Sequence, residues 1–207
     1  MRIGVVPNLL LAISFALTAS FAGCGGGETL FDICGCVPTS PASKDHRHAE
    51  KHVPLPNIPT QEITVSTILG WPIDPALLPP DAPRAGRELK LFHIAHAYVQ
   101  TVRIEHSDCD LHMEISDTAD KMAPRAIVET PVDGEYCSAR QAIQQQLAKH
   151  GIFVGHEQVG ELPQEITPAL QADIVGLAFE DFNHPGRGTA LVATIWELHP
   201  AIVKLLE

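Results

Sequence analysis

The chain has 207 residues and a formal net charge of −11, with 14 Lys and Arg residues against 25 Asp and Glu residues. This acidic balance argues against a nucleic-acid partner, because phosphates attract basic surfaces. The length, less an export signal, predicts one ordinary domain.

The first residues have the pattern of a bacterial export signal. Arg2 is positively charged, and residues 9–22 form an apolar stretch that is short for a membrane span. We therefore expect a signal peptide over residues 1–23. An ordinary secretory signal that is cut near Ala22 is the alternative.

The stretch "FAGC", residues 21–24, resembles the lipobox of bacterial lipoproteins, although Phe21 stands where an aliphatic residue is usual. This resemblance implies that Cys24 is lipidated and anchors the protein to a membrane of the bacterial cell envelope. Gly25 in place of Asp implies the outer membrane or the cell surface rather than the inner membrane.

Four cysteines remain after Cys24, and an even number in an exported protein predicts disulfides. Cys109 and Cys137 both fall in the predicted domain, so we expect them to pair. Cys34 and Cys36 are too close to pair easily with each other. They are interpreted either as a soft-metal or redox dithiol or as unpaired cysteines.

Residues 24–86 are rich in Pro, Gly and short polar residues and show no regular hydrophobic period, which predicts a tether. Within it, "HRHAEKH" brings His46, His48 and His52 close together in sequence. Such tracts can bind transition metals, but a solvated, weakly basic linker is the favoured interpretation. The stretch at 63–71 has strand composition and is expected to dock as an edge element.

Residues 87–207 predict a mainly β domain. One helix is expected in this domain. It begins after an N-cap at Ser138, which forms a capping-box pattern with Gln141, and Gly151 is expected to end it. Pro200 is expected to stop the last strand. The strands are expected at 88–105, 110–116, 125–131, 172–182 and 189–198, with the helix at 139–150.

This order of strands and helix predicts a five-stranded OB-fold-like barrel with one helix between strands 3 and 4. An open antiparallel α+β sheet with a helix on one face is the alternative.

Two groups of polar residues are candidates for a metal site. One stretch, "DCDLHME", places alternate polar side chains on one face of a strand, and carboxylates with an imidazole can bind a divalent cation. The alternative for both groups is ordinary surface polarity and turn chemistry. The first group is Asp108, Asp110, His112 and Glu129, and the second is Asp181, His184, Glu197 and His199.

The succession "DCDLHMEI", "IVETP", "GLAFEDFNHPGRG" and "WELHP" resembles a group of exported bacterial proteins. Their pattern runs D-x-D-x-H-L, E-x-P with a cysteine, G-x-x-F-x-D-x-x-H and E-L-H-P. The resemblance covers about residues 88–203 and implies a shared shape rather than a reaction; Cys109 departs from it. The matching positions are Asp108, Asp110, His112, Glu129, Pro131, Cys137, Gly176, Phe179, Asp181, His184, Gly188, Glu197, Leu198, His199 and Pro200.

A weaker resemblance is to the staphylococcal nuclease barrel, whose calcium loop reads D-G-D-T. It implies that Asp108, Asp110 and Glu129 are the calcium ligands. Cys109 replaces the turn glycine, His112 has no counterpart, and no arginine falls in a recognisable motif.

Three functions are indicated as hypotheses. The first is a lipid-anchored envelope protein whose barrel binds a small ligand or an envelope protein without catalysis, because no hydrolase or nucleotide motif is present. The second is a calcium-dependent, nuclease-like phosphodiesterase. The third is a lipoprotein that binds a divalent cation, the one cofactor that the residues suggest.

Overall fold

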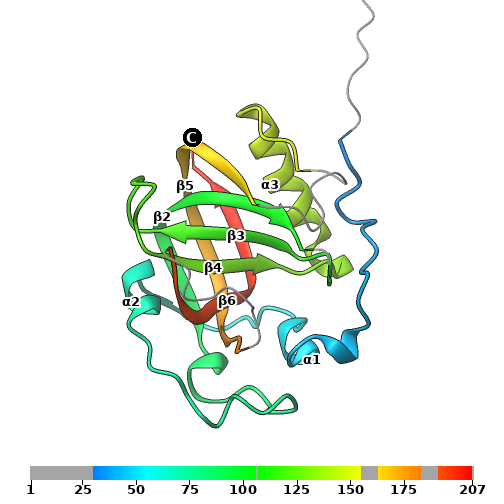
Figure 1. Cartoon of the computed structure of the whole chain (residues 1–207), viewed down its shortest axis with the longest axis vertical. Helices are drawn as coiled ribbons and strands as arrows, with labels where there is room; N and C mark the ends of the chain where they lie inside the picture. The colour runs from blue at the N-terminus through cyan, green and yellow to red at the C-terminus, as the bar shows by residue number, and fades with distance from the viewer. Residues whose placement is uncertain (1–29, 106, 155–162, 183–190, 207) are drawn as a thin grey trace, which may run out of the picture.

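The computed structural model describes residues 30–105, 107–154, 163–182 and 191–206 (Figure 1). Five strands form a closed mixed barrel in the order β2–β3–β4–β6–β5, and β5 returns to pair with β2. Their bounds are β2 (Leu91–Ile104), β3 (Leu111–Ser116), β4 (Arg125–Thr130), β5 (Gln164–Glu180) and β6 (Val192–Leu205).

Strands β4 and β6 are parallel, and the other neighbours around the barrel are antiparallel. Helix α3 (Cys137–Lys149) lies between β4 and β5 in the chain, after a 3₁₀ turn at Gly134–Tyr136. The predicted OB-fold-like barrel is therefore confirmed. An extra strand, β1 (Thr60–Glu62), pairs in parallel with β2 at the edge.

Strand alternation separates a hydrophobic face from a polar face. Met113, Val128 and Leu198 come from three adjacent strands, are fully buried and belong to the hydrophobic core. Successive side chains of a strand point to opposite faces. The residues next to them in the chain therefore lie on the opposite face, where the polar residues described below meet.

Helix α3 begins at Cys137, and Tyr136 precedes it without a side-chain cap. The expected cap at Ser138 is wrong, because the preceding 3₁₀ turn already sets the first helical turn. The C-terminal end of the helix agrees with the prediction that Gly151 stops it: Gly151 has a φ of 73°, which a residue without a Cβ adopts easily. The helix buries Ile143 and Leu147 in the core.

Strands β5 and β6 are longer than predicted. Strand β5 begins at Gln164, before the predicted start at residue 172, and β6 continues through Pro200. The pairing of β5 with β6 is irregular between Gly176 and Ala178, opposite this proline. A proline has no N–H to donate, and an irregularity of pairing is where a strand accommodates one.

Much of the segment that was predicted to be a tether packs on the barrel: Ile33 belongs to the core, and Phe31 packs against it. Arg47 and Lys51 are buried, and Arg47 donates from Nη1 to Glu88 Oε1 at 2.8 Å. A buried charge is costly unless it has a partner, and these charges have partners. The segment can therefore pack on the barrel through polar contacts, although its sequence has no regular hydrophobic pattern. Its elements are the 3₁₀ turns Ala42–Lys44 and Gly86–Leu89 and the helices α1 (His48–Lys51) and α2 (Val65–Leu69).

Helix α2 replaces the strand that was expected from the composition of residues 63–71. Thr64 caps it by accepting the N–H of Thr67 at 3.2 Å. The Asp117 carboxylate accepts the N–H groups of Val65 and Ser66 at 2.7 and 2.8 Å. A carboxylate at a helix start satisfies free donors, so tertiary contact overrides strand propensity here.

The disulfides differ from the predicted pair. Cys34 is bonded to Cys137, and Cys36 is bonded to Cys109. The expected Cys109–Cys137 bond and the expected dithiol are therefore wrong. The N-terminal segment runs along one side of the molecule (Figure 1). Cys34 and Cys36 are thereby bonded to two different partners.

The two disulfides indicate a protein that folds outside the cytoplasm. No helix among the described residues is long and apolar enough to cross a membrane.

Candidate metal centre

A row of buried polar side chains crosses β3, β4 and β6 on the face opposite the core. His112 stands opposite Glu129 in the β3–β4 pair. Val128 stands opposite Leu198 in the parallel β4–β6 pair, so the next residues of these two strands, Glu129 and His199, lie side by side. Nδ1 of His112 lies 2.6 Å from Glu129 Oε1. Nδ1 of His199 lies 2.9 Å from Glu129 Oε2.

Asp110 enters this row from the turn before β3. The turn is tight: Cys109 has a φ of 68°, and Asp108 Oδ1 accepts the N–H of Asp110 at 3.0 Å. The Oδ1 atom of Asp110 accepts the N–H of Val132 at 2.8 Å. The Oδ2 atom of Asp110 lies 3.0 Å from Nε2 of His199, and both side chains are fully buried.

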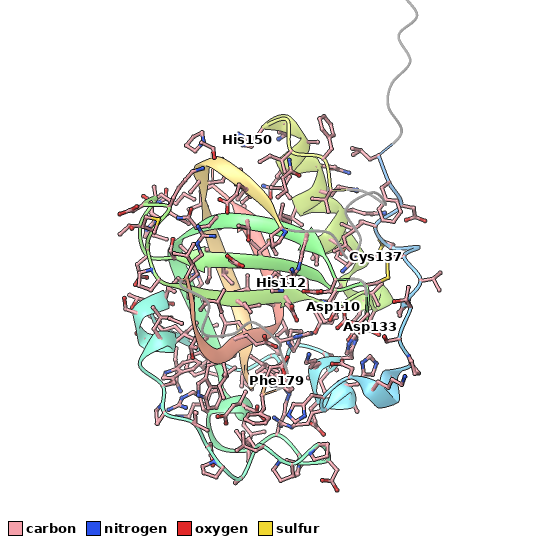
Figure 2. All side chains as sticks on the ribbon, in the orientation of Figure 1. Asp110, His112, Asp133, Cys137, His150 and Phe179 are labelled. Carbon is pink, nitrogen blue, oxygen red and sulfur yellow. A yellow bond between two sulfur atoms is a disulfide. The ribbon has the colours of Figure 1, made fainter. Side chains whose placement is uncertain are left out.

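His52 completes the group from the N-terminal segment, where it directly succeeds helix α1. Its Nε2 lies 3.6 Å from Asp110 Oδ2, and its Nδ1 lies 2.6 Å from Asp133 Oδ2. A carboxylate can only accept, so Nδ1 of His52 donates to Asp133, and Nε2 is the nitrogen that faces Asp110. Figure 2 shows Asp110, Asp133 and His112 at the edge of the barrel that faces α1.

Within the described part of the chain, three atoms at the centre of this group lack an aligned hydrogen bond: Nε2 of His52, Nε2 of His199 and Oδ2 of Asp110. One potential ligand atom from each of these residues lies within 4.8 Å of the other two. Zinc ligands that stand about 2.0–2.1 Å from the ion in a tetrahedron lie about 3.3 Å apart. Asp110 Oδ2 lies 3.0 Å from Nε2 of His199 and 3.6 Å from Nε2 of His52, and these two distances lie on either side of that spacing.

Other combinations of these residues are less suited to a metal. Among the described residues, three other sets also place potential ligand atoms close together: Asp45–His48–His52, in which Nδ1 of His48 lies 3.0 Å from Asp45 Oδ2, Glu105–His112–Glu129, and Glu129–Glu197–His199. However, Nδ1 of His112 is already hydrogen-bonded to Glu129, and Nδ1 of His199 to Glu197 at 3.3 Å. The set of His52, Asp110 and His199 is the one whose three facing atoms are all without such a bond.

The charges around the centre are mainly negative. Lys51 Nζ lies 2.9 Å from Asp181 Oδ2 and 3.2 Å from Asp45 Oδ1. Burial by itself lowers the pKa of Lys51, but Asp181, Glu197 and other nearby carboxylates outweigh burial and raise it well above its usual value. Lys51 and Arg140 supply positive charge here, but the nearby carboxylates outnumber them, so the surroundings favour a further positive charge.

Nearby charges also shift the pKa values of His199 and Glu129 at the centre. Burial lowers the pKa of His199, but contacts with Asp110, Glu129 and Glu197 raise it well above its ordinary value. Burial raises the pKa of Glu129, but the contacts with His112 and His199 hold it well below. In the absence of an ion, a proton on His199 therefore supplies part of the missing positive charge.

Asp108 lies beside this centre and lines a cavity of about 320 Å³ together with His46, Lys51 and Asp181. Burial is the main cause that raises the pKa of Asp108 to about 7, and the charges of Asp110 and Glu129 add to it.

The structure brings the two predicted polar groups into one cluster. Asp110, His112 and Glu129 of the first group meet Glu197 and His199 of the second.

The remaining candidate residues lie at its margin or beyond it. Asp181 contacts Lys51, whereas Asp108 faces the cavity. Glu114, expected beside His112, accepts from Arg125 at 2.8 Å. His184 and Cys24 lie outside the described residues.

His52 is the residue that sequence reasoning missed. The tract of His46, His48 and His52 was recognised, but it was interpreted as solvated because its surroundings have no hydrophobic period. His48 stacks on His52 with ring centroids 3.9 Å apart, while His46 lines the cavity. No family model, curated protein or solved structure matches this chain.

Proposed function

We propose that this protein is an exported envelope protein whose barrel domain binds a divalent transition-metal ion through His52, Asp110 and His199. One observation carries the proposal: two imidazole nitrogens and a carboxylate oxygen converge in a buried place, and none has an aligned hydrogen bond. Buried polar atoms that face one another without an aligned hydrogen bond are uncommon and call for an explanation. Zinc suits two imidazoles and one carboxylate.

The surroundings of each ligand support the proposal. Metal-binding histidines usually donate their second N–H to a carboxylate, which fixes the tautomer and the orientation of the ring. His52 has Asp133 in this place, and His199 has Glu197. The second oxygen of Asp110 is held by the backbone N–H of Val132. Each of the three side chains is thus oriented by a hydrogen bond on the side away from the metal centre.

The nuclease-like alternative has less support. Asp110 and Glu129, two of its expected calcium ligands, both contact His199. The guanidinium group of Arg140, which is near this turn, donates to the carbonyls of Ile33, Thr130 and Cys109. It is therefore occupied by the backbone rather than directed at a phosphate site.

Zinc titration by calorimetry tests the metal site. The full chain is first stripped with a chelator and dialysed. We expect one zinc ion per chain, and at least a 100-fold weaker affinity for Asp110→Asn and His52→Ala. His96→Ala, at an exposed position of β2, is the matched control and is expected to bind as the wild type does. A flat wild-type titration would refute the proposal.

We also propose that a lipid on Cys24 anchors the protein in the envelope. The proposal is supported by the lipobox-like "FAGC" and by disulfides that indicate an extracytoplasmic location. Cells that express the protein are labelled with a lipid precursor. Labelled wild type and unlabelled Cys24→Ser are expected, and a variant that still takes up label contradicts the anchor.

A further inference from the structure

The buried metal centre of His52, Asp110 and His199 poses a problem of access. The side chains of Asp110 and His199 have no exposed surface. The side chain of His52 is 7% exposed, so it is the ligand through which the centre reaches solvent. Of the three ligands, an ion that arrives from solvent at this exposed surface therefore meets His52 first.

A second group of potential ligands lies at this entrance and shares His52. Nδ1 of His48 lies 3.0 Å from Asp45 Oδ2, and these side chains are 30% and 14% exposed. Ligand atoms from Asp45, His48 and His52 all lie within 4.8 Å of one another. His48 and His52 are four residues apart at α1, which places their rings on one side of the helix, 3.9 Å apart.

We propose that Asp45, His48 and His52 form an outer loading site that captures a transition-metal ion and passes it to Asp110 and His199. This loading site rests on the proposed metal-binding function of the inner centre. Transfer is an exchange of ligands without a redox step: the ion keeps His52 while Asp45 and His48 are replaced. His48 binds as a neutral imidazole and releases any proton to solvent.

The outer site is suited to brief occupation. Lys51 Nζ lies 3.2 Å from the other oxygen of Asp45, and this positive charge opposes a cation next to it. The inner centre has more buried carboxylates around it, including Glu129 and Glu197. The ion therefore moves from a weaker, exposed site to a stronger, buried one.

Stopped-flow kinetics with zinc alone test this route, using the full chain. His48→Ala is expected to reduce the association rate constant at least tenfold. Because a route changes both directions equally, the dissociation rate into excess chelator falls by the same factor and the Kd stays within about twofold. Asp45→Asn is expected to act in the same sense. His150→Ala is the control, since this residue lies at the other end of the molecule (Figure 2).

The outcomes separate the loading site from the function on which it rests. An unchanged association rate in His48→Ala overturns the loading site while leaving the inner centre intact. A Kd that weakens as much as in His52→Ala also overturns it, because His48 would then be a permanent ligand. Absence of zinc binding by the wild type at equilibrium refutes the metal centre itself and, with it, the loading site.

Discussion

Nε2 of His199 lies 3.0 Å from Oδ2 of Asp110, and neither atom has an aligned hydrogen bond. His199 projects from β6, whereas Asp110 belongs to the turn before β3. Each is held from its other side, His199 by Glu197 and Asp110 by the N–H of Val132. The barrel therefore fixes two facing atoms that can both bind one cation, which takes the place of the proton on His199.

Removing a group that orients a ligand is expected to weaken zinc binding without abolishing it. Asp133→Asn replaces the carboxylate that lies 2.6 Å from Nδ1 of His52. Such outer partners typically contribute a factor of about 10–100 in metal affinity. Calorimetry is expected to show a loss in this range, and Asp81→Asn, at an exposed position, serves as control. Equal affinities for the two variants would contradict the role of Asp133.

Zinc is expected to stabilise the folded chain, because the unfolded chain cannot bring His52, Asp110 and His199 together. At a free zinc concentration of 100 times Kd, binding raises the free energy of unfolding by about 2.7 kcal/mol. Thermal unfolding with and without zinc measures this as a higher Tm. In Asp110→Asn the zinc-dependent rise is expected to disappear, and an equal rise there would place the ion elsewhere.

The raised pKa of Asp108 predicts a dependence of stability on pH in the metal-free protein. The folded state keeps this proton up to about pH 7, whereas the unfolded chain releases it near the ordinary aspartate pKa of 3.8. The unfolded state therefore binds fewer protons in this window, and stability falls as the pH rises through it.

Asp108→Asn removes this dependence and can still accept the N–H of Asp110. At 1.36 kcal/mol per pKa unit, we expect a gain of up to about 4 kcal/mol at pH 8 and a smaller gain at pH 5. Urea unfolding with chelator at the two pH values is the measurement. Asp120→Asn, at an exposed position, is the control, and equal gains at both pH values would contradict the assignment.

The two disulfides are expected to differ in their effect on the metal centre. Loss of either bond typically costs about 2–4 kcal/mol of stability. Cys109 directly precedes Asp110, so Cys36→Ser/Cys109→Ser is also expected to weaken zinc affinity, measured by calorimetry.

The matched variant Cys34→Ser/Cys137→Ser removes the bond at the start of α3. It is expected to lose stability with little change in zinc affinity. Non-reducing peptide mapping checks the pairing directly. Recovery of a Cys109–Cys137 peptide would contradict the structure.

The buried pair of Arg47 and Glu88 tests whether the N-terminal segment is docked on the barrel. Arg47→Met leaves the Glu88 carboxylate fully buried with its cation removed, and breaking such a pair typically costs about 3–5 kcal/mol. Urea unfolding is expected to show this loss, while Lys90→Met, at an exposed position, changes little. A loss below about 0.5 kcal/mol, the usual range of a surface substitution, would indicate an undocked tether.

Much of the barrel could be predicted because its signals are local. Alternating apolar residues such as Leu111, Met113 and Ile115 indicate a strand from local sequence alone. Helix α3 ends at Lys149, just before Gly151, whose positive φ stops the helix. Where tertiary contacts override local preference, prediction failed. Asp117 caps α2 from a distant part of the chain, and β6 passes Pro200 at an irregular point of its pairing.

The sequence by itself determined the order of strands and helix and identified most polar residues of the centre, because strand alternation places them on one face. Only the tertiary structure decided that the two polar groups are one cluster, and that His52 belongs to it. His52 lies in a segment without hydrophobic periodicity, and two disulfides and buried ion pairs, not a sequence pattern, hold that segment on the barrel. Such long-range partners are chosen by distance in the folded molecule, which no local pattern encodes.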